Sequence, residues 1–174
     1  PRGKQVKNPH AIWYTPVSGI WQTVWLEPVS SKYISNVVSV ADIDNKNLKV
    51  KVGTQNTTSS DVVQIVLKEQ NTIVAMTKGV VGETLELALA DVKLWSPESP
   101  FLYDLEVTLL DKGKKTDKVK SYAAMRKISM HKDKDGIMRM QLNNKDCFQF
   151  GPLDQGWWPD GLYTAPTDEA LAYD

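Results

Sequence analysis

An alternation of apolar and polar residues with a period of two runs through the middle of the sequence and limits its fold more than any other feature. Four runs show it, at residues 48–53, 63–68, 85–89 and 103–109. In the last run, Leu105 and Val107 stand on either side of Glu106. Such alternation places one row of side chains in a core and the other in water, as in a half-buried antiparallel strand. Leu105 and Val107 are therefore predicted to face inward.

Clusters of Asp, Asn and Gly separate these runs and predict turns at residues 44–47, 78–79, 111–113 and 135–136. With further strands at residues 33–44 and 118–128, about seven strands fall in roughly a hundred residues, a spacing typical of immunoglobulin-like sandwiches. The predicted fold is therefore all-β: an immunoglobulin-like β-sandwich of about seven antiparallel strands, with partial elements flanking it. Since Cys147 is the single cysteine, no disulfide can bridge its two sheets.

The composition excludes several classes of partner. Among 174 residues, 21 Lys and Arg balance 21 Asp and Glu, so charge gives no reason to expect nucleic acid or an anionic membrane surface. No apolar run reaches the roughly 18 residues that a membrane span needs, and no span is predicted. The compartment stays open, with a bacterial periplasmic or extracellular location favoured over a cytoplasmic one.

No residues in the sequence form a catalytic or metal-binding pattern. His10 and His131 are far apart and lack metal-ligand spacing, so both are predicted to be surface or turn histidines. Cys147 precedes Phe148 in a predicted strand, which favours a buried, unreactive thiol over a nucleophile. The sequence thus predicts no metal, no cofactor and no catalytic residue in this chain.

The two ends of the chain differ from its middle. Residues 21–26 predict a strand that Pro28 ends, within a segment rich in Trp, Pro and Gly. Residues 137–142 and 146–150 predict a short hairpin around Asn143-Asn144. Both are partial elements, which indicates that they complete structures outside the sandwich.

The last residues predict the beginning of a helix. Thr167 is a typical N-cap, and Asp168 and Glu169 would place carboxylates in the first turn, near exposed N–H groups. The sequence stops at Asp174, about two turns into that helix, and a helix so short is marginal without packing. We interpret this end as a truncation of a longer protein.

Three segments are more specific than the alternating pattern. Residues 19–27 read GIWQTVWLE, residues 94–103 read LWSPESPFLY, and residues 150–163 read FGPLDQGWWPDGLY. Taken together and in this order they resemble glycoside hydrolase family 2, the group that holds β-galactosidases, β-glucuronidases and β-mannosidases. Two short matches depart from the family pattern, since Ala124 stands where a G-x-R-x-I stretch has Gly, and Asn144 where an L-N-G-K turn has Gly.

The resemblance implies three parts. Residues 1–30 would be the last strand of a preceding sugar-binding-type sandwich with its linker, residues 31–128 the immunoglobulin-like sandwich, and residues 129–174 the opening hairpin, loop and first helix of a truncated (β/α)8 barrel. The intact protein would be a retaining glycosidase (β-galactosidase-like) that acts on carbohydrate. Its two catalytic glutamates would lie on later barrel strands, so that this chain alone would be inactive.

The loop at residues 151–163 is the candidate substrate-lining segment of the intact enzyme. Its candidate residues are Asp154, Gln155, Trp157, Trp158 and Asp160. Aromatic faces stack on the C–H surfaces of sugars, and the amide and carboxylates can bind hydroxyl groups. The same tryptophans could instead be core residues of the barrel floor, and Asp160-Gly161 could be no more than a turn. Because the loop lacks the histidines of an R-G-x-N-x-H-E-H-like segment, the sugar stays open.

A self-contained carbohydrate-binding or adhesive sandwich is the alternative from another functional class. It predicts that both ends fold onto the sandwich as complete elements. The enzyme-fragment hypothesis predicts that the ends project, disorder or pair with another chain. It also predicts a homo-oligomer formed through the exposed terminal segments, which carry Trp21, Trp25, Trp157 and Trp158.

Overall fold

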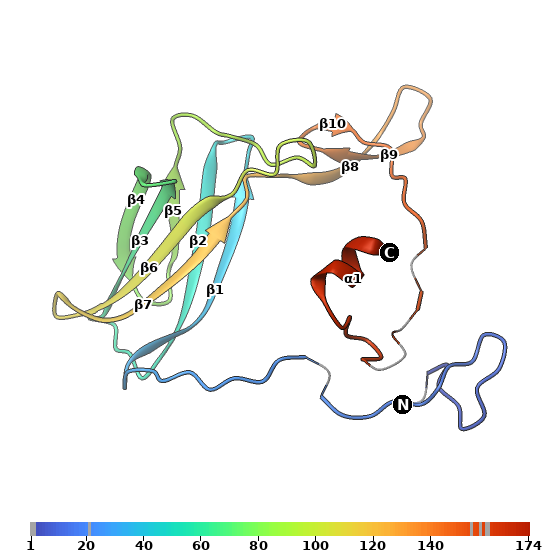
Figure 1. Ribbon diagram of the computed structural model, residues 1–174. Coiled ribbons are helices and arrows are strands. Elements are labelled where there is room, and N and C mark those ends of the chain that lie inside the picture. Colours follow the sequence, from blue (N-terminus) through green and yellow to red (C-terminus); the bar gives the residue numbers. More distant parts are fainter. Residues whose placement is uncertain (1–2, 21, 154, 157, 159–160) are drawn as a thin grey trace. The chain divides into compact units, whose positions relative to one another are not determined.

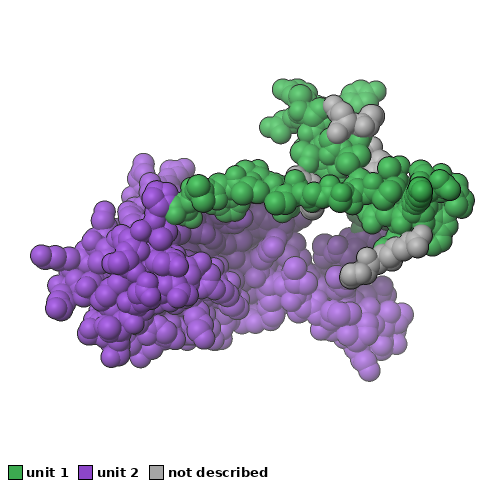
Figure 2. Space-filling view, turned by 90° about the horizontal axis from the view of Figure 1, so that it is seen from below, with its two compact units in different colours: residues 1–27, 150–174 green, residues 28–149 purple. Residues whose placement is uncertain are grey.

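The computed structural model describes residues 3–20, 22–153, 155–156, 158 and 161–174. The chain divides into two compact units: unit 1 holds residues 1–27 and 150–174, and unit 2 holds Pro28–Gln149 (Figure 2). The described residues form the elements β1 (Tyr33–Asp42), β2 (Asn47–Gln55), β3 (Val62–Glu69), β4 (Thr72–Val80), β5 (Thr84–Ala88), β6 (Tyr103–Asp111), β7 (Lys114–Ala123), β8 (Ile128–Lys132), β9 (Met138–Leu142), β10 (Lys145–Asp146) and α1 (Asp168–Tyr173).

Strands β1 to β7 of unit 2 form a sandwich of two antiparallel sheets. One sheet has the order β1-β2-β5 and the other β4-β3-β6-β7 (Figure 1). The inward rows of both sheets form one core, in which Leu105 is 1% and Val107 0% exposed. The all-β fold and the inward direction of both residues are confirmed.

The strand β4 corrects one predicted turn. Lys78 and Gly79 were expected in a turn but lie inside β4, where Gly79 is paired with Val63. A Cβ added to Gly79 would lie 2.3 Å from Cδ2 of Leu85 on β5, so the glycine permits a close approach of the two strands. The chain instead reverses near Gly82, whose φ of +87° suits glycine.

The strand β7 also differs from the predicted range of 118–128, because it begins at Lys114 and ends at Ala123. Its start is fixed by the turn after β6, where Lys112 has φ +48° and Gly113 φ +81°. Two successive positive φ values are typical of the tight hairpin turns that match strand twist. Residues 118–123 of the prediction are in β7 and residue 128 begins β8, whereas residues 124–127 are in neither strand, although Met125 is still fully buried in the sandwich core.

The proline-containing segment at residues 94–103 crosses between the sheets and is held at both ends. Tyr103, 1% exposed, accepts a hydrogen bond at its Oη from the backbone N–H of Lys93 (2.8 Å). At the other end, the N–H of Trp95 donates to the carbonyl of Met125 (3.0 Å). The Arg126 guanidinium lies over the Trp95 ring, 4.6 Å from its centroid. These contacts give the segment a structural role, because Trp95 and Tyr103 anchor it to the sandwich.

The hairpin that follows belongs to a third sheet, ordered β10-β9-β8. Its turn has φ +52° at Asn143 and +64° at Asn144. The Nδ2 of Asn143 donates to the Trp95 carbonyl (2.9 Å) and that of Asn144 donates to Oδ1 of Asp44 (2.7 Å). Asn144, which stands where the family pattern has glycine, therefore makes a contact with the β1–β2 turn that glycine could not make.

Three further expectations are wrong in detail. Strand β10 is only Lys145–Asp146, so the predicted strand at 146–150 is not formed. Cys147 consequently lies outside a strand and is half-buried, while the neighbouring Phe148 is 89% exposed. Of the predicted strand at 21–26, the described residues 22–26 are not in a strand, since no described strand pairs with them.

The helix α1 begins as predicted. Thr167 is extended, and its Oγ1 accepts a hydrogen bond from the N–H of Ala170 (3.2 Å). Asp168 and Glu169 occupy the first turn. No helix in the described part of the chain is long and apolar enough to cross a membrane.

Candidate functional site

Unit 1 brings together the two ends of the chain. The Nε2 of Gln5 donates to the Oη of Tyr163 (2.9 Å), across 158 positions of sequence. The Oη of Tyr14 donates to Oε1 of Gln155 (2.9 Å), across 141 positions. The candidate loop at residues 151–163 is therefore in contact with the N-terminal segment, an arrangement that neither hypothesis for the ends predicted.

Backbone hydrogen bonds fold the N-terminal segment so that these two side chains can reach the loop. The N–H of Tyr14 donates to the carbonyl of Lys4 (2.8 Å), and the N–H of Val6 donates to the carbonyl of Tyr14 (3.0 Å). Between them a turn closes from the N–H of Trp13 to the carbonyl of His10 (2.8 Å). Gln5 and Tyr14 are thereby placed side by side in a parallel bridge. The exposed His10 lies in this turn, as expected.

The candidate loop has its own tight turn. Trp158 and Leu162 exchange two backbone hydrogen bonds, of 2.8 Å and 3.1 Å. The N–H of Thr164 then donates to the carbonyl of Gly161 (3.0 Å). A Cβ on Gly161 would lie 2.0 Å from the Thr164 carbonyl oxygen, a distance no side chain tolerates. The loop therefore needs glycine at this position, and the turn places Tyr163 toward the N-terminal segment.

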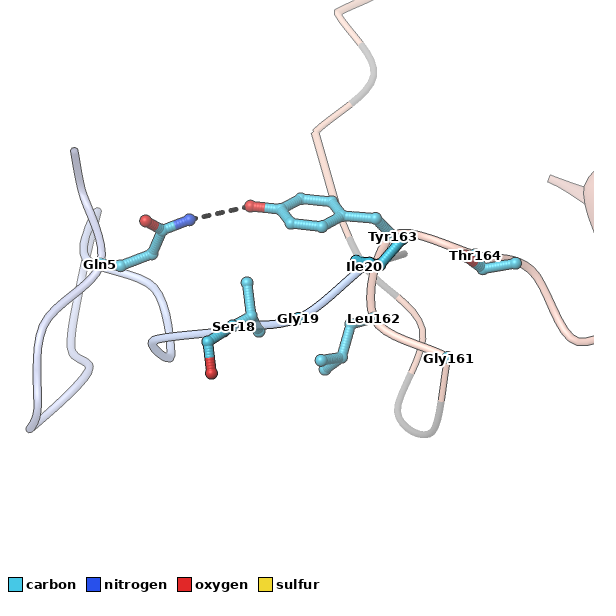
Figure 3. Close-up of a pocket in the computed structure, with 9 residues that line it drawn as sticks. Gln5, Ser18, Gly19, Ile20, Gly161, Leu162, Tyr163 and Thr164 are labelled. Atoms are coloured by element: carbon cyan, nitrogen blue, oxygen red, sulfur yellow. Dashed lines mark hydrogen bonds between the residues drawn. The ribbon is translucent and has the colours of Figure 1, made fainter. Parts of the chain in front are cut away.

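Several hollows adjoin the described residues of the loop, and two of them exceed 500 Å³. The first has a volume of about 520 Å³ and is lined from both ends of the chain by Gln5, Val17, Ser18, Gly19, Ile20, Gly161, Leu162, Tyr163 and Thr164. Figure 3 shows the Gln5 amide and the Tyr163 hydroxyl joined across its upper side. The second, of about 800 Å³, is lined by the loop and α1, including Gln155 and Trp158. Both volumes are in the range of small-molecule sites.

The structure thus describes two of the five candidate site residues and brings them to one hollow: Gln155 and the half-buried Trp158. Asp154, Trp157 and Asp160 lie outside the described residues. Gln5 and Tyr14 were not among the residues expected at the site. The density of Trp, Pro and Gly in the first thirty residues was the one pattern that distinguished their segment, and it did not indicate contact with the loop.

The first hollow is lined by neutral groups, whereas Asp174 adds a carboxylate to the lining of the second. The bonds Gln5–Tyr163 and Tyr14–Gln155 each join an amide to a phenol hydroxyl, and Ser18 and Thr164 add hydroxyl groups to the first hollow. Within the described ranges, no group of three or more His, Cys, Asp or Glu side chains is placed to hold a metal ion. Such a site can bind hydroxyl groups and stack an apolar ring face on an aromatic side chain.

Comparison with known proteins agrees with the fold. The family model for glycosyl hydrolases family 2 matches residues 25–126, more than half of the sequence. The chain belongs to this family. It is 27% identical over 167 residues to a β-galactosidase of Lactococcus lactis, a match that covers 91% of this chain and 15% of that protein.

A solved structure shows the same fold. A β-glucuronidase from Ruminococcus gnavus in complex with D-glucuronic acid superimposes with a TM-score of 0.58 at 17% sequence identity. The match covers 70% of this chain and 20% of that chain. The chain therefore spans about a fifth or less of the length of these relatives.

Proposed function

We propose that this chain is a section of a retaining glycoside hydrolase that acts on carbohydrate, with a β-galactosidase-like activity in the intact protein. In this proposal, residues 31–128 are the non-catalytic immunoglobulin-like domain. Residues 1–30 belong to a preceding sugar-binding-type sandwich and residues 129–174 to the opening of a (β/α)8 barrel. Membership of the family and the small share of each relative that the chain spans support this assignment.

The hollow that holds both Gln155 and Trp158 is the observation that carries the carbohydrate assignment. An indole beside a primary amide offers a stacking face for the C–H groups of a sugar ring and a hydrogen-bonding group for its hydroxyls. Asp154, Trp157 and Asp160 adjoin these residues in sequence and would supply further contacts of the same kinds. The five together are the substrate-lining set of the proposed intact enzyme.

Catalysis itself is assigned to another part of the intact protein. Retaining hydrolysis needs two carboxyl groups about 5–5.5 Å apart, one as acid/base and one as nucleophile. In the proposal these are glutamates on later barrel strands. The sandwich is then a non-catalytic domain, and no residue of this chain takes part in bond cleavage.

Replacing Trp158 with alanine tests the hollow. We expect the intact 174-residue chain to bind methyl β-galactoside or methyl β-glucuronide with a Kd in the millimolar range, and Trp158→Ala to weaken binding by about tenfold, because stacked aromatic contacts contribute on the order of 1 kcal/mol. The measurement is a titration followed by NMR. Trp13→Ala, at a 39% exposed indole elsewhere in unit 1, is the matched control. Equal affinities of both variants and the wild type would contradict a role for the loop in sugar binding.

We also expect the isolated chain to self-associate through its ends. Trp25 is 72% exposed, and Phe148, Phe150 and Leu153 are each more than 80% exposed. Large apolar side chains exposed in this way favour association. Sedimentation velocity should show a mass that rises with concentration and falls in Trp25→Ser. A concentration-independent monomer would contradict this expectation.

A further inference from the structure

Three sulfur-containing side chains lie together at one edge of the small sheet β10-β9-β8, which is labelled in Figure 1. We propose that Met138, Met140 and Cys147 form a binding site for a soft univalent metal ion, Cu(I), with two thioether ligands and one thiolate. All three residues belong to unit 2. The site is separate from the candidate loop and does not depend on the function proposed above.

The pairing of the sheet brings the three residues together. Strand β10 pairs with β9 only at Gln141 and Leu142, so the rest of β9 has no partner strand on this side among the described residues. Beyond β10, the N–H of Cys147 donates to the carbonyl of Met140 (2.9 Å), which places these two residues opposite each other. Met138 lies two positions from Met140 on β9 and therefore on the same face. The three residues thus mark a triangle at the open edge of the sheet.

A hollow of about 650 Å³ adjoins this edge, and all three residues line it. Met138 is 49% exposed, Met140 is 43% exposed and Cys147 is half-buried, so an ion can reach this edge from solvent. The Nε2 of Gln149 donates to the Sγ of Cys147 (3.5 Å). This hydrogen bond restricts the thiol beside the hollow before any ion is bound.

The ligand atoms select the kind of ion. Thioethers and thiolates are soft ligands that favour Cu(I), whereas carboxylates and carbonyls suit Mg²⁺ and Ca²⁺. Two carboxylates in the lining already accept hydrogen bonds, Asp133 from the Nε of Arg139 (2.9 Å) and Asp146 from the Nε2 of Gln141 (3.0 Å). When Cu(I) binds, the thiol of Cys147 releases its proton to solvent and the thiolate neutralises the ion. No electron is transferred in this step.

Competition for Cu(I) against bicinchoninate, without oxygen, tests the site in the 174-residue chain. We expect one Cu(I) per chain. Cys147→Ser should weaken binding by about a hundredfold and Met138→Leu or Met140→Leu by about tenfold each, because each variant removes one sulfur ligand. Leucine is close to methionine in volume and should preserve the fold. Met76→Leu, at a 62% exposed thioether on β4, is the matched control and should bind as the wild type does.

Two results of this titration would overturn the proposal. The first is no binding of Cu(I) by the wild-type chain. The second is wild-type affinity in both Met138→Leu and Met140→Leu, since Cys147 alone would then hold the ion.

The methyl signals of the methionines give a readout that does not depend on affinity. In a chain labelled with ¹³C at the methionine methyl groups, Cu(I) should shift the signals of Met138 and Met140. The signals of Met76 and of the fully buried Met125 should stay in place. Equal shifts at Met76 would overturn the proposal, because any exposed thioether would then bind the ion. Displacement of Cu(I) by equimolar Zn(II), whose ligands are thiolate, imidazole and carboxylate, would overturn it as well.

Discussion

Leu105→Ala is expected to lower the free energy of unfolding of the sandwich by about 2–5 kcal/mol, the range for a buried leucine whose removal leaves a cavity. Leu105 is 1% exposed and lies opposite Leu67 on the neighbouring strand β3. Both side chains belong to the core cluster between the two sheets. Urea denaturation followed by circular dichroism measures the loss.

Asp104→Ala is the control for this substitution, since Asp104 is the exposed neighbour of Leu105 on the same strand. It should leave the denaturation midpoint nearly unchanged, as surface substitutions generally do. Equal losses in the two variants would mean that β6 has the opposite register, with its polar row facing the core.

Asp61→Asn is expected to destabilise the sandwich about as strongly as a truncated core residue. Asp61 is 0% exposed. Both its carboxylate oxygens lie 2.9 Å from the Nζ of Lys32, and Oδ2 also accepts from the N–H of Thr58 (2.6 Å). The Thr58 N–H, followed by the ammonium of Lys32, keeps the pKa of Asp61 below its usual value. Asparagine has one acceptor oxygen in place of two, so the substitution removes a charge and breaks hydrogen bonds at a fully buried position, and Lys32 keeps only Asp111 as an acidic partner.

The matched control is Asp42→Asn, at a more exposed carboxylate at the end of β1. In thermal unfolding, Asp42→Asn should shift the midpoint much less than Asp61→Asn.

Two carboxylates with lowered pKa values, Glu106 and Asp61, should make the sandwich less stable at acid pH. Hydrogen bonds from Lys118 and Lys68 lower the pKa of Glu106 from 4.5 to about 2, and Asp61 is shifted in the same direction. A carboxyl whose pKa is lower in the folded state stabilises it above the pKa of the unfolded chain, and this contribution is lost as the pH falls through the folded value. Stability should therefore decline between about pH 4.5 and pH 2. Glu106→Gln should flatten this decline, and an identical pH profile would contradict the assignment.

The fold was predictable because its information is local. The alternation around Leu105 specifies a strand and its inward face, and the asparagines and glycines between runs specify reversals. The error at Gly79 shows the limit of this reasoning. A glycine in a turn and a glycine that allows a neighbouring leucine to approach look alike in sequence, and only the position of Leu85 distinguishes them.

The candidate site was predictable only in part, for a different reason. The loop at 151–163 has a recognisable motif, so Gln155 and Trp158 could be named. Gln5 and Tyr14 reach that loop across more than 140 positions, and an unmatched glutamine and tyrosine carry no periodicity or spacing that would indicate such a contact. The strand expected at 21–26 failed similarly, because a strand needs a neighbour and no described strand pairs with residues 22–26.

The release of nitrophenol from nitrophenyl β-galactoside and β-glucuronide tests the central claim most directly, measured in parallel for the purified 174-residue chain and for the intact parent protein. Our account predicts turnover by the parent with retention of anomeric configuration, and none by the chain alone, because the catalytic carboxyl pair is assigned elsewhere. Measurable retaining hydrolysis by the 174-residue chain, abolished by Asp154→Ala, would contradict it.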